Sequence, residues 1–130
     1  MSDFSDSLAL SASALRAQAR RLRHVSDNIA NADTLGFRRK IVPFEQETRV
    51  GSVQGEVRLG RINLDRSDLA RIYDPSSPLA DQTGHYDGSN VDLVIEIADA
   101  REAQRSYEAN LKMFDQSRQM SASLLDLLRR

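Results

Sequence analysis

Three acidic side chains are spaced as the ligands of a metal ion would be. Asp92, Glu96 and Asp99 lie at i, i+4 and i+7, so on a helix their carboxylates share one face and could bind a divalent cation. No Glu-x-x-His pattern accompanies them, and acidic residues are favoured at a helix N-terminus by the helix dipole alone. We therefore interpret them as residues of a helix start and predict no metal site. A carboxylate metalloenzyme remains an alternative, and it predicts tight divalent-metal binding.

A basic cluster near the N-terminus could bind phosphate groups. It consists of Arg16, Arg20, Arg21, Arg23 and His24. On a helix Arg16, Arg20 and Arg23 share a face. The formal net charge of the chain is -1 and no aromatic residues alternate with the arginines, which favours a solvated face or an acidic partner helix. A helical module that docks on nucleic acid or anionic lipid through this cluster is the alternative function.

The residues that most enzymes need are scarce. The chain has no cysteine, and its two histidines, His24 and His85, lie far in sequence from a plausible Ser-Asp pair. Neither a Gly-x-Gly-x-x-Gly pattern nor a Walker loop is present to bind a nucleotide. We predict that the protein is not an enzyme and uses no cofactor and no small-molecule substrate.

The N-terminal segment has the periodicity of a long helix. Residues at alternating spacings of four and three form a stripe that is apolar at six of its eight positions: Phe4, Leu8, Ser11, Leu15, Gln18, Leu22, Val25 and Ile29. This spacing is typical of a helix that packs along one side. Asn28, Asn31 and Gly36 are suited to ending it, so we predict a helix over residues 5–31.

The C-terminal segment repeats the pattern without a glycine or proline. Its stripe runs through Leu93, Ile97, Ala100, Gln104, Tyr107, Leu111, Phe114, Arg118, Ser121, Leu125 and Leu128. One helix over residues 91–128 is about 55 Å long at about 1.5 Å per residue. A compact globule of this chain length is only about 36 Å across. The helix must therefore break, or project and pack against another subunit.

Charge favours pairing of the two predicted helices with each other. Residues 7–31 carry four arginines and one aspartate, a net charge of +3, whereas residues 91–128 carry seven acidic and four basic residues, a net charge of -3. The pairing can be within one chain or between chains. The tail adds Leu124, Leu125, Leu127 and Leu128, which cover most of the helix circumference and call for partners on more than one side.

The middle of the chain differs in kind. Glycine and proline interrupt residues 34–90, and Val57, Leu59, Ile62 and Leu64 indicate short strands. The expected fold is mainly α with a smaller β-rich middle, and the two long helices pair as a coiled coil. The expected parts are residues 1–33, 34–90 and 91–130. The start of the chain does not resemble a signal peptide and no run is apolar enough to span a membrane, so the chain is expected in the cytosol unless a dedicated machine exports it.

Residues 28–38 resemble the signature that closes the N-terminal helix in the bacterial flagellar rod and hook proteins. In this chain Asn28 and Asn31 can bond the last backbone groups of the helix, Gly36 permits a sharp exit, and Phe37 can anchor the strand that follows. Asp27 stands where the family often has a second asparagine. Two further stretches, residues 78–92 and 103–110, resemble the proximal rod members of this family, with Glu108 where glutamine is usual.

The resemblance implies a structural subunit of a helical tube, the proximal rod of the flagellar basal body, that transmits motor torque to the distal rod and hook. The N-terminal and C-terminal helices would form its inner core, with the middle region outside. The implied partners are copies of the same chain, FlgB, FlgF, FlgG, the adapter FliE, the MS ring and the flagellar type III export apparatus, with no nucleic acid. Export without a cleaved signal would place the chain in the periplasmic part of the basal body. The residues expected to carry assembly are Asn28, Asn31, Thr34, Gly36, Phe37, Asn90, Asp92, Arg105, Tyr107, Asn110, Leu125 and Leu128.

Overall fold

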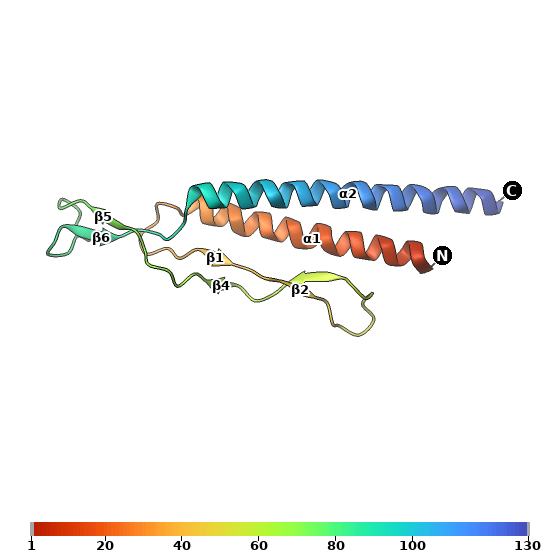
Figure 1. The fold of residues 1–130 in the computed structure, drawn as a ribbon, viewed down its shortest axis with the longest axis horizontal. Helices are drawn as coiled ribbons and strands as arrows, with labels where there is room; N and C mark the ends of the chain where they lie inside the picture. The colour runs from red at the N-terminus through yellow and green to blue at the C-terminus, as the bar shows by residue number, and fades with distance from the viewer. Residues whose placement is uncertain (1, 130) are drawn as a thin grey trace.

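Two long antiparallel helices dominate a computed structural model that describes residues 2–129 (Figure 1). Helix α1 spans Ser2–Ala30 and helix α2 spans Leu93–Arg129, within three residues of the predicted bounds. Neither contains glycine or proline, the residues that most often end a helix. The helices pair within one chain, since Ser7 of α1 hydrogen-bonds Ser117 of α2 at 2.9 Å while Asn28 lies beside Glu96 at the other end.

Helix α2 is longer than its partner and projects past it. Its 37 residues extend about 55 Å, against about 43 Å for the 29 residues of α1. At the free end, α2 therefore continues beyond the start of α1 (Figure 1). The leucine-rich tail lies on this overhang, where Leu127 and Leu128 are 65% and 75% exposed.

The face that α2 presents to α1 differs in part from the predicted stripe. Within residues 2–129, α1 is the only element against which α2 packs extensively. The buried and partly buried positions along its length include 96, 100, 103, 107, 110, 114, 117 and 121, which follow heptad spacing, together with 99, 106 and 115. Only Ala100, Tyr107, Phe114 and Ser121 belong to the predicted stripe; the other members lie exposed. Small or polar residues such as Ala103 and Ser117 take their place, and Ser117 bonds Ser7 of α1.

Several apolar members of the predicted stripe remain exposed. They are Leu93, Ile97, Leu111, Leu125 and Leu128, and we call them the outer stripe. Each is between 39% and 75% exposed. Ile97, Leu111 and Leu125 share a heptad position beside the face turned toward α1, whereas Leu93 and Leu128 share the position of Ala100 and Tyr107 and lie exposed near the ends of α2.

Nearly half of the middle region is one long hairpin, residues 39–65, that runs along α1. Strands β1 (Lys40–Ile41) and β4 (Asn63–Leu64) pair at its base, and β2 (Phe44–Gln46) and β3 (Val57–Leu59) pair farther out. Between the two ladders the returning strand has one residue more than the outgoing strand, a bulge beside Pro43. Of the predicted strand residues, Val57, Leu59 and Leu64 lie in strands and Ile62 falls in the bulge.

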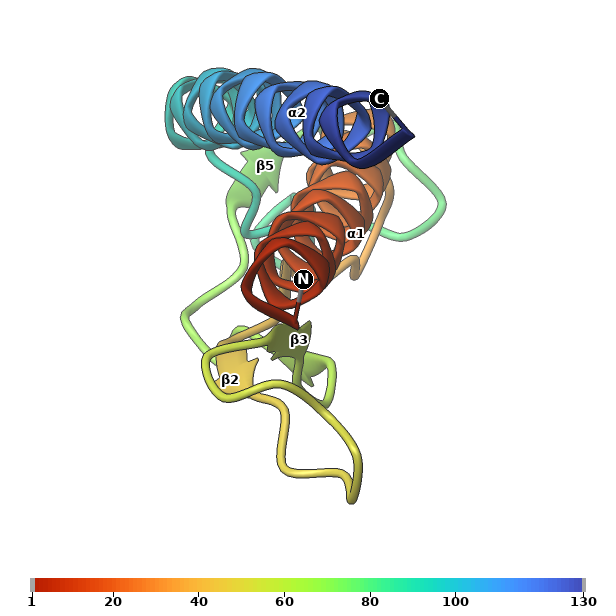
Figure 2. The ribbon, with the colours of Figure 1, turned by 90° about the vertical axis from the view of Figure 1, so that its right-hand side faces the viewer.

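The long hairpin, α1 and α2 form three layers. In an end-on view α1 lies between α2 and the β2–β3 ladder (Figure 2). Ser13 fixes the hairpin to α1, since its hydroxyl donates to the carbonyl of Leu10 at 2.8 Å and accepts from the amide of Val57 at 3.2 Å. The fold is mainly α with a small β-containing middle, as predicted.

A second hairpin, the tip hairpin, projects past the other end of the helices (Figure 1). Its strands β5 (Arg71–Tyr73) and β6 (His85–Asp87) are joined by residues 74–84. The Asp81 carboxylate organises this loop by accepting hydrogen bonds from Thr83, from the amide of His85 and from Arg71. These bonds hold the pKa of Asp81 well below its ordinary value, with the Thr83 hydroxyl contributing most.

The core of the single chain is small. Among residues 2–129 the buried apolar side chains are Ala17, Val25 and Ala103. The accessible surface is 9330 Å². A compact monomer of 14.6 kDa exposes about 6,900 Å². No helix within the described residues combines the length and apolar character that crossing a membrane requires.

Candidate functional site

The end of α1, the start of α2 and the bases of both hairpins meet at one place, which we call the junction. Asn28, on the last turn of α1, is 1% exposed there. Its amide nitrogen donates to the carbonyl of Lys40 at 3.0 Å and its carbonyl oxygen accepts from the amide of Lys40 at 2.9 Å. The side chain thus pairs with a backbone residue as a neighbouring strand would, and this joins the long hairpin to α1.

Arg39 and Glu96 form the charged centre of the junction. The Glu96 side chain is fully buried, and its carboxylate accepts from Nε of Arg39 and, at 3.4 Å, from Asn28. Nη2 of Arg39 also donates to Asp99 at 2.9 Å. Burial alone lowers the pKa of Arg39, but the hydrogen bond and the charge of Glu96 outweigh it and raise that pKa above its ordinary value. A buried carboxylate without such a partner would be strongly unfavourable.

Asn90 connects the start of α2 to the long hairpin. Its carbonyl oxygen accepts from the amide of Arg39 at 2.6 Å, and its amide nitrogen donates to the carbonyl of Asp65 at 2.9 Å. The same nitrogen reaches the carbonyl of Ser67 at 3.2 Å. One side chain therefore holds both ends of the hairpin base.

The predicted helix exit is present, with one difference. The Asn31 side chain donates to the carbonyl of Asp27 at 2.8 Å, so it does bond the last turn, and the Thr34 hydroxyl donates to Asn31 at 3.0 Å. Gly36 adopts φ +70° and its amide donates to the carbonyl of Gly88 at 3.0 Å. Asn28 differs, because its side chain bonds Lys40 rather than the backbone of its own helix.

Phe37 is partly buried at the start of the chain that leads to β1. Its carbonyl accepts from the amide of Asn90 at 3.3 Å. The residues before α2 and those after α1 are therefore tied to each other along a short stretch of backbone.

The three acidic residues at the start of α2 do not converge on a cation site. Asp92 accepts from the amide of Val94 at 3.0 Å and so caps the helix. Glu96 and Asp99 both bond the guanidinium of Arg39. Within residues 2–129 no group of three potential ligands is close enough to hold a metal.

The remaining predicted residues lie along α2, away from the junction. Tyr107 and Asn110 are partly buried on the side of α1, and the Asn110 amide donates to the carbonyl of Ser106 at 2.8 Å. Arg105 is exposed. Leu125 and Leu128, on the outer stripe, are 42% and 75% exposed, so they are available to another chain.

Among residues 2–129, Arg21 is the arginine of α1 that forms ion pairs with acidic residues of α2. Nη2 of Arg21 lies 3.8 Å from Asp99 and 3.6 Å from Glu102, and its guanidinium lies over the ring of Phe44 at 5.7 Å. Arg16, Arg20 and Arg23 are exposed and face away from α2, so they make no ion pair with any described residue. The opposite net charges predicted that the helices pair, but of the four arginines of α1 only Arg21 forms ion pairs with described residues of α2.

The Arg39–Glu96 pair is the main feature that the sequence did not reveal. The two residues are 57 positions apart. The sequence marked Glu96 as an acidic residue at a helix start and as one of three carboxylates with metal-ligand spacing, but not as the partner of Arg39. One clue is its position: it occupies the same heptad position as Ala103, Asn110 and Ser117, which together mark the face turned toward α1.

Two family models match the chain at its two ends. The model of flagella basal body rod proteins matches residues 8–38, which cover most of α1 and the helix exit. The model of the C-terminal region of flagellar basal body rod FlgEFG proteins matches residues 82–127, which cover the second strand of the tip hairpin and most of α2. The matched segments thus include all the predicted assembly residues except Leu128.

Curated relatives match over nearly the whole length. The chain is 41% identical to the flagellar basal-body rod protein FlgC of Agrobacterium fabrum, over 99% of this chain and 98% of that protein. It is 33% identical to FlgC of Bacillus subtilis, over 93% and 95%, and 32% identical to FlgC of Salmonella typhimurium, over 91% and 92%.

Proposed function

Because this chain belongs to the FlgC family of flagellar basal-body rod proteins, we propose that it assembles as a structural subunit of the proximal rod. In this arrangement α1 and α2 form the inner layer of a helical tube and the middle region lies outside. The family is one of structural proteins and is not known for catalysis.

The outer stripe is the observation that carries this proposal. Five apolar side chains lie exposed at two adjacent heptad positions of α2, and the single chain covers none of them fully. Burying apolar surface contributes about 25 cal/mol per Å². A monomer gains nothing from such a stripe, whereas neighbouring helices in a tube would bury it on assembly.

The junction suits a part that carries mechanical load. Torque applied to the outer region has to reach the helices through the places where the hairpins join them. At the junction that connection consists of paired hydrogen bonds from Asn28 and Asn90 and of the buried pair of Arg39 with Glu96. Rotation of the hairpins against the helices would break several bonds together, so we propose that the junction transmits torque.

The partners we propose are other copies of this chain, FlgB, FlgF, FlgG, the adapter FliE and the MS ring. Export by the flagellar type III apparatus, without a cleaved signal, would bring the chain to the periplasmic part of the basal body. The residues we propose for assembly contacts are those at the helix exit and along the exposed side of α2.

The first test is to delete the gene, score motility and probe purified basal bodies of the parent strain for the protein. We expect loss of motility and the protein in the basal-body fraction. A motile deletion strain, or a protein confined to the cytosol, would overturn the assignment.

The second test addresses the outer stripe. The double variant Leu125→Asp/Leu128→Asp should fold, because both side chains are exposed, but should fail to enter basal bodies and to restore motility. Val50→Asp is the matched control, since Val50 is 99% exposed in the turn of the long hairpin, and it should restore motility. Normal incorporation of the double variant would show that these leucines are not an interface.

A further inference from the structure

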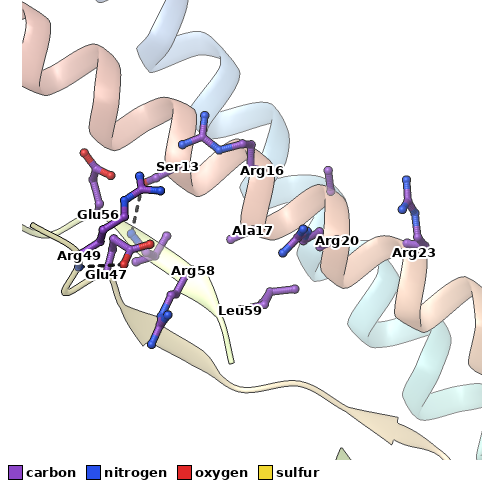
Figure 3. A pocket seen from close by; sticks show the side chains of 12 residues that line it. Ser13, Arg16, Ala17, Arg20, Arg23, Glu47, Arg49, Glu56, Arg58 and Leu59 are labelled. Atoms are coloured by element: carbon purple, nitrogen blue, oxygen red, sulfur yellow. Dashed lines mark hydrogen bonds between the residues drawn. The ribbon is translucent and has the colours of Figure 1, made fainter. Parts of the chain in front are cut away.

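A groove between α1 and the long hairpin has no role in the packing described so far. Its volume is about 440 Å³. One wall is the exposed face of α1 with Arg16, Arg20 and Arg23, and the opposite wall carries Arg49 and Arg58 (Figure 3). We call these five residues and the space between them the arginine groove.

Two glutamates also line the groove, but their carboxylates are bonded to the hairpin itself. Glu47 accepts from the amides of Thr48 and Arg49 at 3.1 and 3.0 Å, and the bond from Arg49 is the main cause that lowers the pKa of Glu47. Glu56 is nearly buried and accepts from the amide of Val53 at 3.0 Å. They shape the turn of the hairpin and do not neutralise the arginines of α1.

The arginines are therefore in excess. Five arginines and two glutamates give the groove a formal charge of +3, although the chain as a whole has a charge of -1. Arg58 lies 3.4 Å from Glu45, whereas Arg16, Arg20, Arg23 and Arg49 make no ion pair with any residue in 2–129. Four unpaired guanidinium groups, three on α1 and one on the hairpin, are suited to bidentate bonds with carboxylates.

We propose that the arginine groove binds an acidic segment of another protein chain. Arg16 and Arg23 are one heptad apart on the helix, about 10 Å, so they match carboxylates one heptad apart on a partner helix. A flat anionic membrane does not enter a groove between two walls, and no aromatic side chain lines it for base stacking. This proposal does not depend on the assignment to the rod.

The test in solution uses the purified full chain and fluorescence anisotropy. The probe is a labelled helical peptide of about 20 residues with glutamates at heptad spacing. Three competitors of the probe are a matched peptide with glutamine in place of glutamate, a single-stranded oligonucleotide and phosphatidylglycerol vesicles. We expect binding of the glutamate peptide that weakens with salt, and little binding of the other three.

The key variant is Arg16→Gln/Arg20→Gln/Arg23→Gln, which should lower the affinity for the glutamate peptide about tenfold or more. Replacement of the same three residues by lysine should restore part of it, because charge returns without the bidentate geometry. The control Arg61→Gln/Arg66→Gln/Arg101→Gln removes as many exposed charges elsewhere and should bind normally. Circular dichroism of each protein verifies that the helices are intact.

A second measurement addresses the protein in cells. A photo-crosslinking amino acid at position 20 should crosslink to a peptide rich in Asp and Glu, identified by mass spectrometry, and the same group at position 66 should not. Tighter binding of the oligonucleotide or the vesicles than of the glutamate peptide would overturn the proposal. So would a crosslinked peptide without acidic residues, or equal affinity of the key variant and the control.

Discussion

Glu96 is an acidic side chain in the most buried position that the helix pair offers. It is 0% exposed, and Arg39 supplies the charge that makes this burial tolerable. Such a pair contributes little net stability compared with apolar residues of the same volume, but removal of one partner leaves an unpaired charge in the interior. The role of the pair is therefore to fix the position at which the long hairpin meets α2.

A double-mutant cycle tests this view of the pair. Arg39→Met should lower the free energy of unfolding by about 3 kcal/mol or more, since Glu96 is left buried and unpaired. Arg39→Met/Glu96→Leu should recover most of that loss, because neither residue is then charged. Urea unfolding followed by circular dichroism measures both. A double variant as unstable as the single variant would show that the charges themselves hold the junction.

The residues at the helix exit show what sequence can and cannot predict at this scale. The roles of Asn31 and Gly36 depend on backbone groups a few positions away, so the local sequence was enough to predict them. Asn28 and Arg39 act on groups 12 and 57 positions away, and nothing in the neighbouring residues indicates those partners. Contacts between residues so far apart in sequence can be identified only from the three-dimensional arrangement of the helices and strands.

At the scale of elements, α2 shows how a heptad pattern can serve two surfaces. The sequence predicted the helix and nearly its bounds, because apolar spacing and the absence of glycine and proline are local properties. It did not predict which face meets α1, because small residues such as Ala103 pack as closely as large ones do. The largest apolar residues were assigned to the pairing face, whereas several of them lie on the outer stripe.

Ala103 is expected to set the distance between the two helices. Its side chain is 0% exposed on the face toward α1. Ala103→Leu should destabilise the helix pair by about 1–3 kcal/mol, because the added atoms have no space. Gln104→Leu, on the exposed side of the same turn, is the control and should change stability little. Thermal and urea unfolding compare the two, and equal effects would mean that the helices are not closely packed at this point.

The tip hairpin gives a prediction about pH. The pKa of Asp81 is lowered by the Thr83 hydroxyl, the His85 amide and the Arg71 guanidinium. For a carboxyl whose folded pKa is depressed, the stabilisation is present above the ordinary value of 3.8 and is lost as the pH falls toward the folded value. NMR titration of the Asp81 carboxyl carbon should therefore find it ionised at pH values somewhat below 3.8. A midpoint at 3.8 would contradict the bonded loop.

At the scale of the whole molecule, surface area is the property that needs an explanation. The chain exposes 9330 Å², about 2,400 Å² more than a compact monomer of its mass. An excess of this size is comparable with the area of an obligate subunit interface. The sequence already indicated it, because a helix of this length does not fit in a globule of this chain length. The stability of the free chain should accordingly be low and should rise on assembly.

Hydrogen exchange can show which residues of the free chain are unstable and become stable on assembly. In the free chain the amides of residues 124–129 should exchange quickly, because this end of α2 lies beyond the start of α1 and carries exposed apolar side chains. In purified basal bodies the same amides should exchange at least about tenfold more slowly, since neighbouring chains would then cover the outer stripe.

The amides of Arg39 and Lys40 provide the internal control, because they are bonded to Asn90 and Asn28 within the chain. They should be protected in the free chain and in the basal body alike. Protection of residues 124–129 in the dilute free chain would mean that the end of α2 needs no partner, and the large exposed surface would then not indicate assembly. Loss of protection at Arg39 and Lys40 in the free chain would instead mean that the junction forms only on assembly.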